Sequence, residues 1–157
     1  MTRLGKDEYF LKVADLLKER STCPRRQVGC VLVDQYHNII ATGYNGNARG
    51  TEHCIDIPCP GAVNPETGQR YESGQGLDRC EAIHAEQNAL LQCSDVMKIF
   101  KAYTTTKPCV HCMKLLMNTS VKEIYYLEDY ASSSAAQVSA LAEKAGILLI
   151  QIQSLNS

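Results

Sequence analysis

Hydrophobic and polar positions alternate between a helical period and a strand period along most of the chain. The first helical stripe consists of Phe10, Val13, Leu16 and Leu17. It predicts a helix over residues 5–20 that ends before a turn-forming segment. Two apolar runs, 28–33 and 39–42, then predict a pair of strands joined by a hairpin-like turn at 34–38.

The second half of the chain continues the alternation. Further helices are predicted at 81–93, 109–118 and 133–145, and further strands at 101–106, 123–127 and 147–150. Gly146 is the expected C-terminal stop of the last helix. This order predicts an α/β fold with three layers, α/β/α, around a central mixed five-stranded sheet. We expect one domain over residues 1–157, with no internal repeat.

One histidine, one glutamate and two cysteines form the strongest chemical signal. His84 and Glu86 lie two residues apart, and Cys109 and Cys112 follow as a Cys-x-x-Cys pair. One imidazole and two thiolates leave the fourth tetrahedral position of Zn²⁺ open to water, which is typical of catalytic zinc. Pro108 indicates that the pair opens a helix, whose N-terminal partial charge favours thiolates, so we expect both cysteines to be ionised.

Glu86 is then available as an acid and base. Two thiolates and a neutral imidazole cancel the charge of Zn²⁺, so the metal acidifies its water weakly and a neighbouring base becomes useful. His84 and Glu86 can address one metal only from the opening turn of a helix, which we expect to begin near Glu81. A His-x-Glu motif with a downstream Pro-Cys-x-x-Cys is the signature of zinc nucleobase deaminases, in which the glutamate carries protons without binding zinc.

Two other interpretations of the Cys-x-x-Cys pair remain. A structural zinc site would use Cys109 and Cys112 and leave His84 as an ordinary helix residue, but it would not require the carboxylate. A thioredoxin-like redox pair would follow the first strand of its fold, whereas this pair lies past the midpoint of the chain. His111, between the cysteines, is expected to face solvent on another side of the helix.

Four segments resemble deoxycytidylate (dCMP) deaminase, particularly the bacterial and phage type, in order and spacing. They are IHAEQNAL at 83–90, PCVHC at 108–112, VGCVLV at 28–33 and TGYNG at 42–46. The resemblance implies a cytidine deaminase-like fold and hydrolytic deamination of dCMP to dUMP and ammonia, which supplies dUMP for thymidylate synthesis. It also implies a homo-hexamer activated by dCTP and inhibited by dTTP, with Mg²⁺ on the triphosphate. The regulatory nucleotide is expected near Tyr44, Gly46 and Asn47.

The segment from residue 44 to 79 interrupts the alternation. It lacks periodicity and is far longer than the ~12–15 residues at which an unstructured connection becomes uncommon. Four cysteines of the chain lie in or beside loops, two within this segment and two outside it: Cys54, Cys59, Cys23 and Cys80. Four thiolates complete a structural zinc site, and the resemblance implies a second zinc at the positions of Cys23 and Cys54 in some family members. There are two alternatives to a four-cysteine zinc site. His53 could replace one cysteine as a ligand, or the four cysteines could be reduced surface thiols without a metal. Cys30 and Cys93 are expected in the core.

A free nucleotide needs partners for its phosphate, sugar and base. Arg25 and Arg26 offer forked donors for a phosphate, and the resemblance favours Arg25; a solvated loop charge is the alternative. Asn45 is a turn residue by composition, and the resemblance places it against the nucleotide. The resemblance also implies that Tyr130 packs near the base and sugar and that the backbone of Ala85 contacts the cytosine edge. Without the resemblance, Tyr130 would be interpreted as a residue of the hydrophobic core or of its rim.

Composition and charge narrow the functional classes. The chain has 157 residues, 45% apolar and 21% charged, and a net charge of −1, which is ordinary globular composition without the basic surface of a nucleic-acid binder. Its N-terminus lacks a signal-peptide core, and no apolar run approaches ~20 residues. We therefore expect a soluble cytoplasmic enzyme with no membrane or nucleic-acid partner, whose eight cysteines serve metal binding and reduced thiols.

Two further functions remain possible on the sequence. Another deaminase of the superfamily would act on tRNA adenosine, cytidine or a riboflavin precursor, and the acidic pI and the TGYNG segment argue against the first of these. A non-catalytic zinc-binding module would require Glu86 to be incidental.

Overall fold

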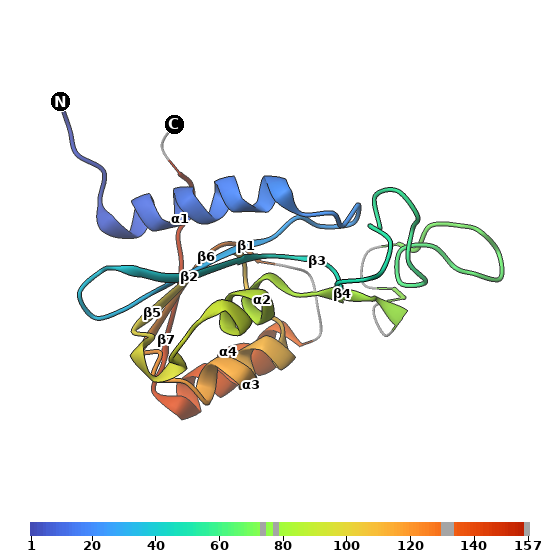
Figure 1. The fold of residues 1–157 in the computed structure, drawn as a ribbon. Helices are drawn as coiled ribbons and strands as arrows, with labels where there is room; N and C mark the ends of the chain where they lie inside the picture. The colour runs from blue at the N-terminus through green and yellow to red at the C-terminus, as the bar shows by residue number, and fades with distance from the viewer. Residues whose placement is uncertain (73–74, 77–78, 130–133, 156–157) are drawn as a thin grey trace.

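A mixed five-stranded sheet forms the centre of the computed structural model, which describes residues 1–72, 75–76, 79–129 and 134–155 (Figure 1). Its strands are β1 (Gly29–Val33), β2 (Ile39–Tyr44), β5 (Lys101–Thr106), β6 (Glu123–Glu128) and β7 (Leu148–Gln151). The spatial order is β2-β1-β5-β6-β7. Strand β1 is antiparallel to β2 and β5, whereas β5, β6 and β7 are parallel, so the predicted mixed sheet is confirmed.

Helices cover both faces of the sheet, as the three-layer prediction requires (Figure 1). The helices are α1 (Lys6–Leu17), α2 (Ala85–Gln92), α3 (Val110–Met117) and α4 (Ala135–Ala145). Helix α1 lies alone on one face, and the other three lie on the opposite face. Helix α4 ends at Gly146, whose φ of 69° is left-handed, so the predicted stop is confirmed. No helix in the described part of the chain is long and apolar enough to cross a membrane.

Strand β1 divides the core into two halves because alternate side chains point to opposite faces of a strand. Val31 and Val33 pack with Phe10 and Leu11 of α1. Leu32 packs on the opposite face, in the cluster formed with α2, α3 and α4. All five residues of β1 are buried, which is why this strand reads as a continuous apolar run in the sequence.

Two glycines of the sheet let helices lie directly against it. A Cβ atom on Gly29 would overlap the carbonyl group of Ala14 in α1. A Cβ atom on Gly43 would overlap the backbone of Ala85 and Ala89 in α2. Gly43, the first glycine of the 42–46 motif, therefore serves the packing that places α2 on β2.

The start of α2 differs from the prediction. Helix α2 begins at Ala85 rather than near Glu81, because residues 82–83 are extended. They form β4 (Ala82–Ile83), which pairs antiparallel with β3 (Gly46–Asn47) in a second, two-stranded sheet. Beyond this small sheet, the remainder of the long irregular segment extends away from the central sheet (Figure 1).

Candidate functional site: a metal centre beside a buried glutamate

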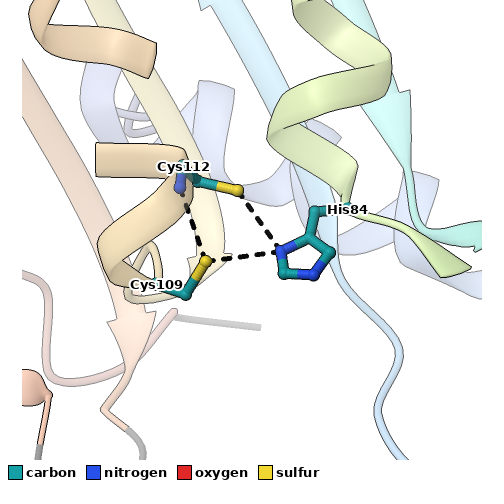
Figure 2. Close-up of side chains that lie close together, drawn as sticks. All are labelled: His84, Cys109 and Cys112. Atoms are coloured by element: carbon teal, nitrogen blue, oxygen red, sulfur yellow. Dashed lines mark hydrogen bonds between the residues drawn. The ribbon is translucent and has the colours of Figure 1, made fainter. Parts of the chain in front are cut away.

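His84, Cys109 and Cys112 converge at one point (Figure 2). The Nδ1 atom of His84 lies 3.4 Å from Sγ of Cys109 and 3.3 Å from Sγ of Cys112. The ligand atoms of the three residues lie within 4.8 Å of one another. Bonds of typical zinc length at tetrahedral angles would separate a nitrogen and a sulfur ligand by about 3.6 Å. The donor set and its spacing therefore fit Zn²⁺, and the predicted ligand trio is brought together.

Two helix beginnings position the three ligands. His84 immediately precedes α2, and its N–H donates to the Oε1 atom of Gln87 at 2.8 Å. Cys109 precedes α3, as Pro108 predicted, and its sulfur accepts a hydrogen bond from the N–H of Cys112 at 3.4 Å. The partial positive charges of both helix N-termini therefore face the place where thiolates would collect.

The two cysteines differ in acidity. Hydrogen bonding to Cys112 lowers the pKa of Cys109 to about 3, and His84 contributes to the shift in the same direction. The same contact, together with burial, raises the pKa of Cys112. In the metal-free chain these shifts favour the thiolate at Cys109 and the thiol at Cys112, and the ionisation of both cysteines stays a prediction. Cys112 would release its proton as the metal binds.

Glu86 lies beside this centre without belonging to the ligand group. It is the second residue of α2 and is only 5% exposed. Burial raises the pKa of its carboxyl group above the usual range, although the charge of His84 acts in the opposite direction. A buried carboxyl group next to a metal centre can accept and return a proton, which fits the predicted acid and base.

Asn45 is placed near the active-site helix but is engaged by the backbone. Its Nδ2 atom donates to the carbonyl oxygen of Arg26 at 2.7 Å, and its Oδ1 atom accepts from the N–H of Val28 at 2.9 Å. The side chain therefore fixes the segment that enters β1. Ala85, the first residue of α2, is fully buried. Their contacts to a nucleotide stay predictions, and Tyr130 lies outside the described residues.

Arg25 holds the irregular segment. Its guanidinium group donates to the carbonyl oxygens of Gly61 at 2.7 Å, Gln75 at 2.6 Å and Glu72 at 2.8 Å. These contacts give Arg25 a structural function that the sequence did not indicate. A phosphate would have to be bound by the same guanidinium group, so the phosphate contact stays a prediction.

The four loop cysteines interact, but less closely than the catalytic trio. The N–H of Cys59 donates to Sγ of Cys54 at 3.2 Å. Burial raises the pKa of Cys54 to about 11, and the charges of Cys59 and Cys23 add to the shift. Burial also raises the pKa of Cys80, with Cys59 and Cys23 again contributing. Among the described residues, no three of these sulfurs meet the spacing that the catalytic trio meets.

Cys59 has the surroundings of a metal-binding thiolate within this group. Burial alone would raise its pKa, yet the pKa is lowered because the backbone of Glu81 and neighbouring N–H groups donate to the sulfur. The adjacent Cys54 N–H donates to the Oδ1 atom of Asn47 at 3.0 Å, which joins the cysteine loop to β3. Of the two cysteines expected in the core, Cys30 is fully buried and Cys93 is only partly buried.

Three residues around the site were not predicted from the sequence. Asn88 of α2 donates from Nδ2 to the carbonyl oxygen of Tyr44 at 2.8 Å, which ties α2 to the end of β2. Thr104 of β5 contacts Glu86, with 3.0 Å between Oγ1 and Oε1. Lys107, just before the Cys-x-x-Cys pair, is 6% exposed. The available signals were a polar residue inside a helical motif, a threonine in a strand of strand-forming residues, and a lysine two residues before a predicted metal ligand.

Comparisons with known proteins agree with this geometry. The family model described as cytidine and deoxycytidylate deaminase zinc-binding region matches residues 4–128. Deoxycytidylate deaminase of Mycobacterium phage D29 is 35% identical over 80% of this chain and 97% of its own length. ComE operon protein 2 of Bacillus subtilis is 37% identical over 98% of this chain and 74% of its own length.

Longer relatives and a solved structure extend the comparison. Deoxycytidylate deaminase of Schizosaccharomyces pombe is 37% identical over 92% of this chain, which spans only 43% of that protein. The crystal structure of dCMP deaminase from cyanophage S-TIM5 with dCMP and dUMP shares the fold, with a TM-score of 0.71, 24% identity, and coverage of 97% of this chain and 100% of that one. Together with the match to the family model, these relatives show that the chain belongs to the cytidine and deoxycytidylate deaminase family.

Proposed function

We propose that this protein is a zinc-dependent hydrolase that converts dCMP to dUMP and ammonia. The observation that carries the proposal is a His-Cys-Cys ligand trio with the buried Glu86 beside it and outside the ligand group. A structural zinc site or a redox pair would have no use for this carboxylate. The phage and yeast relatives are deoxycytidylate deaminases, which supports dCMP as the substrate.

The chemistry divides between the metal and Glu86. Zinc at the three ligands would supply an acidified water molecule as the nucleophile for C4 of cytosine. Glu86 accepts a proton from this water and delivers it to N3 of the base. Glu86 then moves the remaining proton of the added oxygen to the amino group, which departs as ammonia. The water thus provides the oxygen of the new carbonyl group and both transferred protons.

Substrate contacts are proposed on the family resemblance, with the placement of the surrounding residues as support. Ala85 and Asn45 lie at the start of α2 and at the end of β2, so they are proposed to contact the base edge and the sugar. Arg25 is proposed to bind the phosphate while it also holds the irregular segment, and Tyr130 to pack against the nucleotide. This arrangement would distinguish a nucleotide from a nucleoside by the phosphate contact.

The loop cysteines are proposed to hold a second, structural zinc. Cys23 and Cys59 contribute to the raised pKa values of Cys54 and Cys80, and the thiolate of Cys59 is stabilised by backbone N–H groups. A bound metal would draw the four sulfurs together and fix a segment that has little regular structure. His53 as a replacement ligand remains the alternative.

Regulation and assembly are proposed on the family resemblance. A homo-hexamer activated by dCTP with Mg²⁺ and inhibited by dTTP would bind these nucleotides near Tyr44, Gly46 and Asn47. This region connects β2 to α2 through Asn88 and to the cysteine loop through Asn47, so a nucleotide there can act on the active-site helix. The rate should depend sigmoidally on dCMP and become hyperbolic with dCTP. Hyperbolic kinetics unaffected by either triphosphate, in protein confirmed as an oligomer, would overturn this proposal.

A substrate panel tests the proposed function. Purified protein with its zinc content measured would be assayed on dCMP, deoxycytidine, cytidine, a riboflavin precursor and tRNA under one set of conditions. We expect dCMP to be deaminated with the highest kcat/KM. Faster turnover of another substrate would assign the chain to a different branch of the superfamily. Full zinc occupancy without turnover of any substrate would favour a non-catalytic zinc module.

A further inference from the structure

Thr104 occupies a buried position beneath the start of α2. It belongs to β5, where it pairs with Cys30 of β1, and it is only 1% exposed. Cys30 belongs to the core cluster on the α2 side of the sheet. A threonine at such a position places a hydroxyl group where an apolar strand would place a methyl group.

The hydroxyl group of Thr104 lies between the Glu86 side chain and the end of β5. Its Oγ1 atom is 3.0 Å from Oε1 of Glu86 and 3.0 Å from the carbonyl oxygen of Thr106. Glu86 belongs to α2, which begins directly after His84. Thr106 ends β5 and leads directly into the loop that carries Cys109. One hydroxyl group thus joins the proton carrier to the strand that delivers the cysteine ligands.

We propose that Thr104 is a positioning residue that sets the place of the Glu86 carboxyl group relative to the metal ligands. The inference rests on the proposed deaminase function. The torsion that turns a glutamate carboxyl group is broad, so packing alone leaves its oxygen atoms poorly oriented. A hydrogen bond from a fully buried hydroxyl group restricts that rotation, since a buried carboxylate oxygen that loses this donor is costly. Glu86 is thereby held in one orientation before substrate arrives.

The Thr106 carbonyl oxygen is a second acceptor for the single hydrogen of the Thr104 hydroxyl group. A hydroxyl group carries one hydrogen and can also accept, so Thr104 can donate to Glu86, or donate to Thr106 while it accepts from a protonated Glu86. Its single hydrogen has an acceptor in both arrangements. Glu86 consequently keeps its contact with Thr104 whether it has just taken up a proton or just released one.

A set of substitutions at position 104 tests the proposal. Thr104→Val keeps the shape and removes the hydroxyl group, whereas Thr104→Ser keeps the hydroxyl group. We expect Thr104→Val to lower kcat on dCMP by roughly tenfold to a hundredfold, as small misplacements of catalytic groups do, with little change in KM. Catalytic zinc content should stay at the wild-type value. Thr104→Ser should restore most of the turnover.

Two further variants keep the test decisive. If Thr104→Val does not fold, Thr104→Ala and Thr104→Ser form a pair that differs only by the hydroxyl group. Thr105→Val is the matched control, because the Thr105 hydroxyl group is buried but accepts from the N–H of Gly29, at 3.1 Å. It should lower the melting temperature without selectively lowering kcat.

The outcomes separate this inference from the proposed function. Wild-type kcat in Thr104→Val, or equal losses in the serine and alanine variants, would overturn the positioning inference alone. Loss of zinc from Thr104→Val would assign the hydroxyl group to metal-site integrity and would also overturn it. Wild-type protein that turns over no substrate in the panel would overturn the proposed function and the inference together.

Discussion

The ammonium group of Lys107 donates a hydrogen bond to the hydroxyl group of Ser139, with 2.9 Å between Nζ and Oγ. The same Nζ atom lies 3.2 Å from the carbonyl oxygen of Ala135 and 3.9 Å from a carboxylate oxygen of Asp129. Lys107 directly precedes Pro108 and Cys109. Its buried side chain therefore links the metal-binding loop to the first turns of α4 by hydrogen bonds. A buried ammonium group is tolerated here because it has acceptors and a countercharge.

Replacing Lys107 by methionine should destabilise the protein. The variant keeps an apolar chain of similar length but removes the ammonium donor of the Ser139 hydroxyl group, while the Ala135 carbonyl oxygen still accepts from the Ser139 hydroxyl group at 3.3 Å. We expect a loss of about 1–3 kcal/mol in the free energy of unfolding, measured with urea. Lys114→Met, on an exposed face of α3, is the control and should change little. Equal effects of the two substitutions would contradict a structural function for the buried amine.

Removing the carboxyl group of Glu86 should separate chemistry from metal binding. Glu86→Gln retains the size of the side chain and a polar end, so we expect the fold and the catalytic zinc to remain. Turnover should fall by ~10²–10⁴-fold, because an essential proton carrier is lost. Metal analysis and kcat measured on the same preparation check both expectations. A variant that loses its zinc would place Glu86 among the ligands instead.

Metal analysis should distinguish the two proposed zinc sites. With both sites filled, the protein should contain close to two zinc ions per chain. Cys54→Ser should remove one and lower thermal stability more than kcat, whereas Cys109→Ser should remove one and abolish turnover. Removal of zinc by a chelator should have both effects. A single zinc per chain, unchanged by Cys54→Ser, would leave the loop cysteines as reduced thiols.

Truncating Arg25 should affect nucleotide preference and the irregular segment differently. A charge-assisted phosphate contact is worth about 1.5–3 kcal/mol, so Arg25→Ala should reduce the preference for dCMP over deoxycytidine by roughly tenfold to a hundredfold. Because the guanidinium group also binds three loop carbonyl groups, limited proteolysis within residues 61–75 should become faster. Equal losses of kcat/KM on both substrates would show that Arg25 serves structure alone.

Tyr103 should make stability fall at alkaline pH. Its phenol is fully buried and donates to Oδ1 of Asp7 at 2.6 Å, and burial raises its pKa above the usual value. Above about pH 10 the unfolded chain releases this proton while the native protein keeps it, so unfolding becomes more favourable. The free energy of unfolding should fall less steeply with pH in Tyr103→Phe than in the wild type. Tyr36→Phe, at an exposed position, should follow the wild type, and identical slopes for all three proteins would contradict the linkage.

The sequence predicted two kinds of feature: helices and strands with a periodic hydrophobic pattern, and sites whose residues form a recognisable motif. Strand 101–106 was predicted at its observed bounds because its strand-forming residues are bounded by turn signals. The zinc trio was recognisable because its spacing reflects ligand chemistry. Strand β4 was missed because two residues cannot display an alternating pattern. The contacts of Arg25 and Thr104 depend on which segments meet in space, and neither a loop arginine nor a strand threonine identifies its partner in advance.

Strand β1 makes assembly of the metal centre depend on a late step of folding. Its Val31 pairs with the nearby Thr42 and also with the distant Tyr103. The pairing with Thr42 closes a short loop, and the resulting hairpin contacts α2 at Gly43. The pairing with Tyr103 closes a much longer loop at a greater cost in entropy, and it adds the strand that leads to Cys109. A chain that has formed only the hairpin and packed α2 on it at Gly43 has His84 in place but lacks the strand that leads to its cysteine partners. Tight zinc binding by the full trio is therefore a signature of a completed central sheet, and it should appear last when the protein refolds.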